Sequence, residues 1–136
     1  MNKNIKPDKG IFFNGQIFDS YKFVSDLIRN AKNSIILIDN YIDDSVLQLF
    51  TKRKNNVKAI IYTQKISKTL KQDLEKHNSQ YPKIEIKKVE TFHDRFIVID
   101  KKELYHIGAS LKDLGEKCFA LSKFNINPQK ILEEFK

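Results

Sequence analysis

Two short, continuous runs of apolar residues constrain the fold of this chain most strongly. The first is Ile35–Ile38 and the second lies within Val57–Thr63. Apolar runs that do not alternate with polar residues are typical of strands covered on both faces, as in parallel sheets. Between the two runs, apolar residues recur at helical spacing over 44–54. The pattern therefore predicts a β-α-β unit with two buried strands.

The flanking segments extend this unit into one domain. Helices are expected over 21–32, 67–79 and 128–135, and the Asn14-Gly15 pair predicts a hairpin over 11–18. Further strands are expected at 84–89, 96–99, 104–108 and 118–122. Because 136 residues are used up by these elements, we expect a single α/β domain over 11–136, with a mixed β-sheet flanked by helices. Residues 1–10 hold few apolar groups and are expected to form a flexible N-terminal tail.

The net charge of +8 is concentrated in one stretch of the chain. Residues 52–88 contain eleven basic and three acidic side chains, whereas the segments on either side are each neutral. A localised basic excess favours an anionic partner, such as nucleic acid or an anionic membrane surface. The alternative is a set of lysines that is only solvated. The candidate contacts in this stretch are Lys52, Arg53, Lys54, Lys65 and Lys68.

The cysteine and histidine content limits the disulfides and metal sites that the chain can form. A single Cys118 forms no internal disulfide and fits a reducing, cytoplasmic location, and one Cys with three scattered His builds no zinc cluster. We expect no metal and no cofactor, and no apolar run approaches the roughly 18 residues of a membrane span. Asp43 or Asp44 is explained as a helix cap. His77 is expected to be solvated and His106 to serve packing or the surface.

The segment from Phe92 to Asp100 is the most informative for function. His93 and Arg95 are two residues apart at a strand start, so both side chains leave one face. A guanidinium binds a phosphoryl group through paired hydrogen bonds, and an imidazole serves as nucleophile or proton carrier near neutral pH. Asp100, at the far end of the strand, can orient or cap a loop. Ser110 can bring a hydroxyl to the same phosphate.

This segment resembles the signature of the phospholipase D superfamily, which is His-x-Lys, four residues, Asp, and then Gly-Ser-x-Asn. The resemblance covers roughly residues 20–136, and it implies that His93 is a nucleophile that forms a phosphohistidine. Arg95 stands at the phosphate-binding lysine, Asp100 at the motif acid and Ser110 at the motif serine. A metal-independent phosphodiesterase acting on nucleic acid is thereby implied. Because the chain has one such motif, an active form would be a homodimer.

The chain departs from the signature in ways that leave a second function open. The motif lysine is Arg95, one extra residue precedes Ser110, and Lys112 occupies the asparagine position. The string is also similar to C-terminal segments of bacterial and phage proteins of the KilA-N type, which implies a neighbouring DNA-binding domain. The tripeptide His93-Asp94-Arg95 further resembles the phospholipase D-like C-terminal domain of MIT-domain proteins, which implies a membrane-associated module without catalysis. The alternative is thus an inactive module that binds nucleic acid or anionic lipid.

Two further residues are predicted to lie near the site. Tyr41 follows the first buried strand, and ligands gather at the carboxyl ends of strands in open α/β sheets. Lys112 follows the motif hairpin and is a candidate phosphate contact. A structural role for His93, bonded to Asp94 or Asp100, is the alternative to catalysis.

Overall fold

The computed structural model describes residues 9–12, 17–90, 92–113, 120–124 and 126–133. The strands are β1 (Lys9–Phe12), β2 (Ser34–Ile38), β3 (Lys58–Thr63), β4 (Ile84–Lys88), β5 (Arg95–Ile99), β6 (Glu103–Ile107) and β7 (Ala120–Phe124). The helices are α1 (Ile17–Asn30), α2 (Asp44–Phe50), α3 (Lys68–Gln80), α4 (Gln129–Leu132) and the short 3₁₀ helix η1 (Leu111–Asp113).

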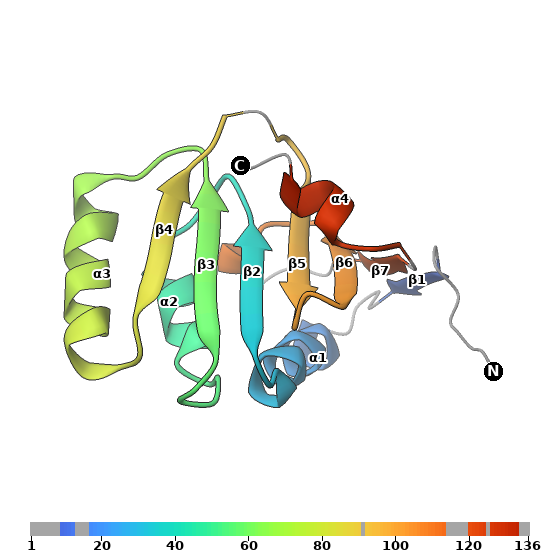
Figure 1. The fold of residues 1–136 in the computed structure, drawn as a ribbon, viewed down its shortest axis with the longest axis horizontal. Helices are drawn as coiled ribbons and strands as arrows, with labels where there is room; N and C mark the ends of the chain where they lie inside the picture. The colour runs from blue at the N-terminus through green and yellow to red at the C-terminus, as the bar shows by residue number, and fades with distance from the viewer. Residues whose placement is uncertain (1–8, 13–16, 91, 114–119, 125, 134–136) are drawn as a thin grey trace.

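All seven strands form one mixed sheet in the order β1-β7-β6-β5-β2-β3-β4. Strands β2, β3 and β4 are parallel, and α2 and α3 make the crossovers between them (Figure 1). Strand β5 joins β2 antiparallel, and β6 and β7 continue the antiparallel half. The predicted α/β class and mixed sheet are therefore confirmed, including the parallel pairing of the first strands.

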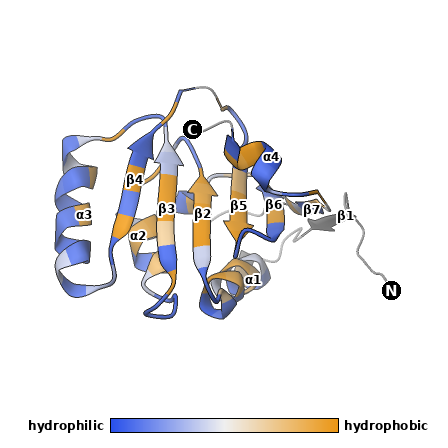
Figure 2. Ribbon diagram, viewed as in Figure 1, coloured by the Kyte–Doolittle hydropathy of each residue, from blue (hydrophilic) through white to orange (hydrophobic). Residues whose placement is uncertain are grey.

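The two buried runs are apolar on both faces because both faces of the central sheet are covered. Ile35 and Leu37 pack into the larger core cluster beside residues of α1, α2 and α3. Ile36 and Ile38 face the other way, into a smaller cluster that is covered in part by Ile131 of α4. Figure 2 shows the resulting hydrophobic band through β2 and β5. Helix α2 is capped by Asp43, whose carboxylate accepts the Ser45 N–H at 3.0 Å, as predicted.

The N-terminal part of the chain differs from the prediction. The hairpin over 11–18 is wrong, because residue 17 already begins α1 and Phe18 lies in its first turn. Residues 13–16 lie outside the described part of the chain, as do residues 1–8 of the expected tail. Lys9 and Gly10 belong to β1, which pairs antiparallel with β7 at the other end of the sequence. A local turn signal was thus overridden by a long-range strand pairing.

Smaller differences occur at the C-terminus. The last strand, predicted at 118–122, is observed at 120–124, and the helix predicted over 128–135 is described over 129–132. Residues 134–136 lie outside the described part of the chain.

Arg53 is a structural residue and not a surface contact, so its predicted role in binding nucleic acid is wrong. Only 5% of the residue is exposed. Its Nε donates to the Val57 carbonyl at 3.1 Å and its Nη1 to the Phe50 carbonyl at 2.8 Å. Its Nη2 donates to the carbonyl of Pro82. The guanidinium therefore ties the end of α2 to the start of β3 and to the connection before β4.

His77 is also buried, which contradicts its predicted solvation. It is 8% exposed, and its Nδ1 lies 2.7 Å from Oδ1 of Asn78. Its ring stacks on Tyr81 with centroids 5.3 Å apart. Asn78 in turn pairs with both backbone groups of Ile84 at 3.0 and 3.1 Å, so this cluster anchors the end of α3 to β4.

Candidate functional site

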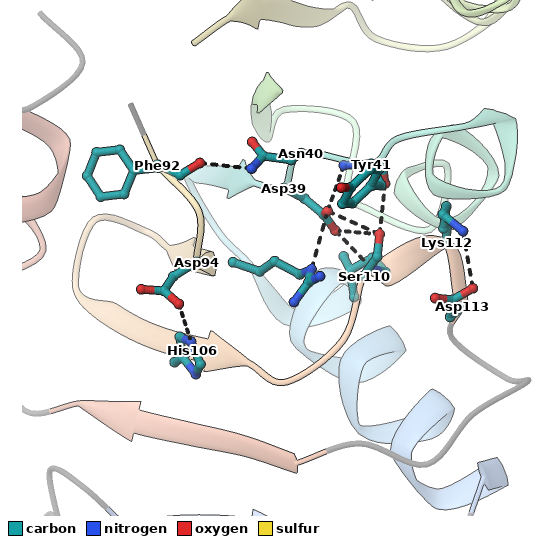
Figure 3. A network of polar contacts seen from close by, with 11 residues as sticks. Asp39, Asn40, Tyr41, Phe92, Asp94, His106, Ser110, Lys112 and Asp113 are labelled. Carbon is teal, nitrogen blue, oxygen red and sulfur yellow. Dashed lines mark hydrogen bonds and ion pairs between the residues drawn. The ribbon is translucent and has the colours of Figure 1, made fainter. Parts of the chain in front are cut away.

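Three segments that are distant in sequence meet at one edge of the sheet, which we call the carboxyl edge. It is the edge where β2 ends, β5 begins and the chain leaves β6. Asp39 follows β2 directly and Ser110 follows β6 (Figure 3). Arg95 is the first residue of β5. Because Ile38 pairs with Phe96 in the antiparallel register, the next residues along, Asp39 and Arg95, face each other.

Asp39 is the centre of the polar network at this edge, although the residue is fully buried. Its Oδ2 accepts the N–H of Leu111 at 2.9 Å, and its Oδ1 accepts the N–H of Tyr41 at 3.1 Å. The Ser110 hydroxyl lies 3.1 Å from both carboxylate oxygens and 2.8 Å from the Tyr41 carbonyl. With one proton, that hydroxyl donates to one of these acceptors at a time. Asp39 thus joins the end of β2 to the segment after β6.

The surroundings of Asp39 act on its pKa in opposite directions. Burial raises the pKa of the carboxyl group, and this effect prevails. The N–H groups of Leu111 and Tyr41, the Ser110 hydroxyl and the nearby Arg95 cation work against it. The carboxylate is therefore held at a cost in desolvation that these neighbours only partly offset.

Arg95 is bound to this network on one side and open on the other. Its Nε lies 3.8 Å from Oδ1 of Asp39, within ion-pair range but beyond a hydrogen bond. The Nε atom is buried and has no hydrogen-bond partner among the described residues. About 28% of the side chain is exposed. A partly exposed guanidinium is suited to bind an oxyanion.

His93 lies in the exposed loop between β4 and β5, two residues before Arg95. The loop is held on one side by Asn40, whose Nδ2 donates to the Phe92 carbonyl at 2.8 Å. It is held on the other side by Asp94, whose Oδ1 lies 3.6 Å from Nε2 of His106. The structure thus brings His93 and Arg95 to one edge, with His93 accessible from solvent. Ser110 lies at the same edge but is buried, and its hydroxyl is bonded to Asp39 and Tyr41 and not free for a phosphate.

Asp100 lies at the opposite end of β5, away from His93. Its carboxylate accepts the backbone N–H groups of Lys32, Asn33 and Ser34 at 3.0, 2.6 and 3.1 Å. Partial burial opposes the charged form, but these three bonds prevail and hold the pKa of Asp100 below its usual range. Its predicted place among the catalytic residues therefore fails. The loop-capping role weighed for it matches the geometry, because it anchors the β5–β6 turn to the start of β2.

Tyr41 and Lys112 both lie at the carboxyl edge, as expected. Tyr41 is 57% exposed. Lys112 is half-buried in η1, and its Nζ lies 3.4 Å from Oδ1 of Asp113.

The predicted basic flank is divided by the fold. Lys65 lies in the loop after β3 and Lys68 at the start of α3, both toward the carboxyl edge. Lys52 and Lys54 follow α2 and lie toward the opposite edge, where β2, β3 and β4 begin. The Lys52 ammonium sits 5.4 Å from the centre of the Tyr21 ring.

Sequence reasoning missed two residues of the site. The motif and its spacing indicate neither Asp39 nor Asn40. The available signal was position: a charged residue that directly follows a buried strand lies next to the interior, where a charge is tolerated only if it has hydrogen-bonding or ionic partners. Among the described residues, no group of three or more His, Cys, Asp or Glu side chains is placed to hold a metal ion. In the same part of the chain, no helix is long and apolar enough to cross a membrane.

The chain is similar to known proteins in its structure but not in its sequence. No protein-family model and no curated protein matches the chain. NucT from Helicobacter pylori superposes with a TM-score of 0.67 at 13% identity, over 94% of this chain and 90% of NucT. TrmBL2, an archaeal chromatin protein with a novel mode of DNA binding, gives 0.60 at 16% identity, over 99% of this chain and 52% of TrmBL2.

A third similar structure is the polyphosphate kinase from Porphyromonas gingivalis. It has a TM-score of 0.60 at 10% identity, over 93% of this chain and 24% of the kinase. At these identities the likeness concerns the fold alone. Together with the sheet topology, it shows that the chain has a phospholipase D-like fold, a single α/β domain with a mixed sheet flanked by helices.

Proposed function

We propose that this chain is a metal-independent phosphodiesterase of the nuclease type, acting on nucleic-acid phosphodiesters with His93 as the nucleophile. The observation that carries the proposal is the arrangement at the start of β5. There the exposed His93 precedes Arg95, a cation whose buried Nε has no hydrogen-bond partner among the described residues. The fold that the chain shares with NucT supports this proposal.

In the proposed reaction, an imidazole nitrogen of His93 attacks phosphorus and forms a P–N bond as the P–O bond to the leaving group breaks. A second histidine donates a proton to the departing oxygen. Water then attacks phosphorus, the P–N bond breaks, and the second histidine takes the proton from that water. Arg95 binds the non-bridging oxygens of the phosphate. The ion pair between Arg95 and Asp39 limits how far the guanidinium can move.

The second histidine would come from another copy of the chain. The sequence holds one His-x-Arg motif, so a homodimer in which two His93 side chains meet across a two-fold axis would complete the site. The exposure of His93 and Tyr41 at the carboxyl edge is what such a meeting requires.

The test is hydrolysis of bis(p-nitrophenyl) phosphate in EDTA. The wild-type chain should release nitrophenol with burst kinetics, and His93→Ala should reduce the rate to the buffer level. His77→Gln is the matched control, because it removes another imidazole at the end of α3, which the Asn78 contacts anchor to the start of β4, opposite the loop that carries His93. Denaturing the reaction during the burst should trap an acid-labile phosphoryl group on the protein. A dimer whose rate equals that of His93→Ala would refute the proposal.

One observation favours a second candidate, the inactive binding module. Part of the Arg95 charge is directed at the buried Asp39 carboxylate, so Arg95 has a structural use that needs no substrate. This module would bind nucleic acid or anionic lipid without turnover. It predicts that Arg95→Ala weakens binding to DNA or to phosphatidylserine vesicles, that raised salt does the same, and that wild type and His93→Ala bind equally.

A further inference from the structure

The edge of the sheet opposite the candidate site, which we call the amino edge, gathers lysines that are scattered in the sequence. At this edge β2, β3 and β4 begin and β5 turns into β6 (Figure 1). Each connection that passes along it contributes at least one exposed lysine. We call this set the basic edge: Lys32, Lys54, Lys58, Lys83, Lys101 and Lys102.

Backbone hydrogen bonds place these connections side by side. The N–H of Lys58 donates to the Asn33 carbonyl at 3.0 Å, and the N–H of Asp100 donates to the Ser34 carbonyl at 2.8 Å. These bonds join the starts of β2 and β3 and the β5–β6 turn. The buried Arg53 then joins the connection before β3 to Pro82, beside Lys83. The lysines are therefore presented on a rigid frame and not on independent loops.

The positive charge of this edge is offset in part by Asp100, whose carboxylate interacts electrostatically with Lys102. Among the described residues, no ion pair joins any of the six lysines to a carboxylate. The nearby carboxylates have other partners. Asp26 pairs with Lys22 at 2.9 Å, Glu103 pairs with Lys123 at 3.0 Å, and Asp100 is held by three backbone N–H groups.

A hollow of about 440 Å³ lies within the basic edge. Lys58 and Lys101 line it together with Asn33, Ser34, Asn56 and Asp100. The Asp100 carboxylate is bonded to three backbone N–H groups, so the two lysines and two asparagines are the donors that can receive one phosphate group.

The dimensions and chemistry of the edge fit the backbone of a duplex. Neighbouring strands lie roughly 4.8 Å apart, so the span from β5 to β4 is about 14 Å, which faces about four phosphates of one DNA strand at 3.4 Å per step. The set consists of lysines, which contact phosphate as point charges and do not read base edges. Tyr81 lies beside Lys83, but its ring is stacked on His77 and is not a free platform for a base.

We propose that the basic edge is a second nucleic-acid surface, distinct from the carboxyl edge, which binds the phosphate backbone of duplex DNA independently of sequence. It places a duplex on the side of the domain away from His93. This inference does not depend on catalysis, since it concerns binding by a different edge.

The test compares two triple variants in a His93→Ala parent, so that binding is measured without turnover. One is Lys58→Gln, Lys101→Gln and Lys102→Gln on the basic edge. The matched control is Lys71→Gln, Lys76→Gln and Lys130→Gln, three exposed lysines on α3 and α4 with the same loss of charge. Fluorescence anisotropy with a random-sequence duplex gives the affinity over a series of KCl concentrations, and thermal melts check folding.

Each phosphate contact contributes about 0.9 to the slope of log affinity against log salt, so the basic-edge variant should lose about 2.7 from the slope. The control should lose less than about 1. A slope equal to that of the parent, or equal losses in both triples, would overturn the proposal. Vesicles containing phosphatidylserine supply a second measurement. If the basic-edge variant loses vesicle binding while its DNA slope is unchanged, the surface is a membrane contact and the nucleic-acid assignment is wrong.

Discussion

Replacing Asp100, the acid of the motif, tests how much this residue contributes to the stability of the fold. Its carboxylate accepts N–H bonds from Lys32, Asn33 and Ser34, which precede it by 66 to 68 residues. A hydrogen bond to a charged group is worth about 1.5–3 kcal/mol, and partial exposure reduces this to about 1 kcal/mol each. Asp100→Ala should therefore cost about 3 kcal/mol of unfolding free energy, which lowers Tm by about 10 °C in a chain of this size.

The pH dependence of this loss follows from the lowered pKa of Asp100. A carboxyl whose pKa is lower in the folded state stabilises the fold above its unfolded pKa of about 3.9, and this contribution disappears as the pH falls through the folded pKa. The difference between wild type and Asp100→Ala should thus be full at pH 7 and should shrink as the pH falls below the unfolded pKa of about 3.9. Urea denaturation at pH 7 and at a pH below that value measures it.

Two further variants separate the charge from the backbone conformation. Asp100 has a φ of 57°, and asparagine tolerates this left-handed region well, so Asp100→Asn removes the charge and leaves the turn intact. We expect about half the loss of Asp100→Ala. Glu75→Ala, an exposed carboxylate on α3, should change stability by less than about 0.5 kcal/mol. A loss below about 1 kcal/mol in Asp100→Ala at pH 7, or an equal loss at both pH values, would refute the anchoring role.

Three other predictions concern single contacts. Arg53→Met should cost about 3–5 kcal/mol in urea denaturation, because it leaves several buried carbonyls without donors; a loss under about 1 kcal/mol would contradict this. Lys101→Gly should stabilise the fold by about 0.5–1 kcal/mol, since Lys101 has a φ of 56°, and a lower Tm would speak against the strained turn. Ser110→Ala should raise the pKa of the Asp39 carboxyl further, because a bond to its charged form is lost. A carbon-13 NMR titration measures that pKa, and an unchanged or lower value would show that the hydroxyl does not donate to Asp39.

Local patterns predicted much of the fold. The runs at 35–38 and 57–63 became β2 and β3, the helical spacing between them became α2, and the motif strand became β5. These elements depend on side-chain periodicity and on caps such as Asp43, which act within a few residues. The Asn14-Gly15 signal failed because β1 pairs with β7, which is more than a hundred residues away in the chain. No local pattern carries that information.

Only those residues of the candidate site that are close together in the sequence could be predicted. His93 and Arg95 were identified because they are two residues apart, and Ser110 because it follows the hairpin. Asp39 was missed as their partner, because its contact with Arg95 depends on the antiparallel register of β5 against β2. Asp100 was grouped with His93 by sequence distance, whereas a strand places its two ends far apart.

The sequence by itself determined the α/β class, the buried strands and the pair His93–Arg95, since each is a consequence of spacing along a few residues. Only the tertiary structure decided that Asp39 joins Arg95 and Ser110, and that Arg53 is an internal anchor. It also divided the basic stretch and joined part of it to Lys32, Lys101 and Lys102 at the amino edge. The physical reason is that charge and hydrogen bonding act through space, and strand order sets which distant residues are neighbours.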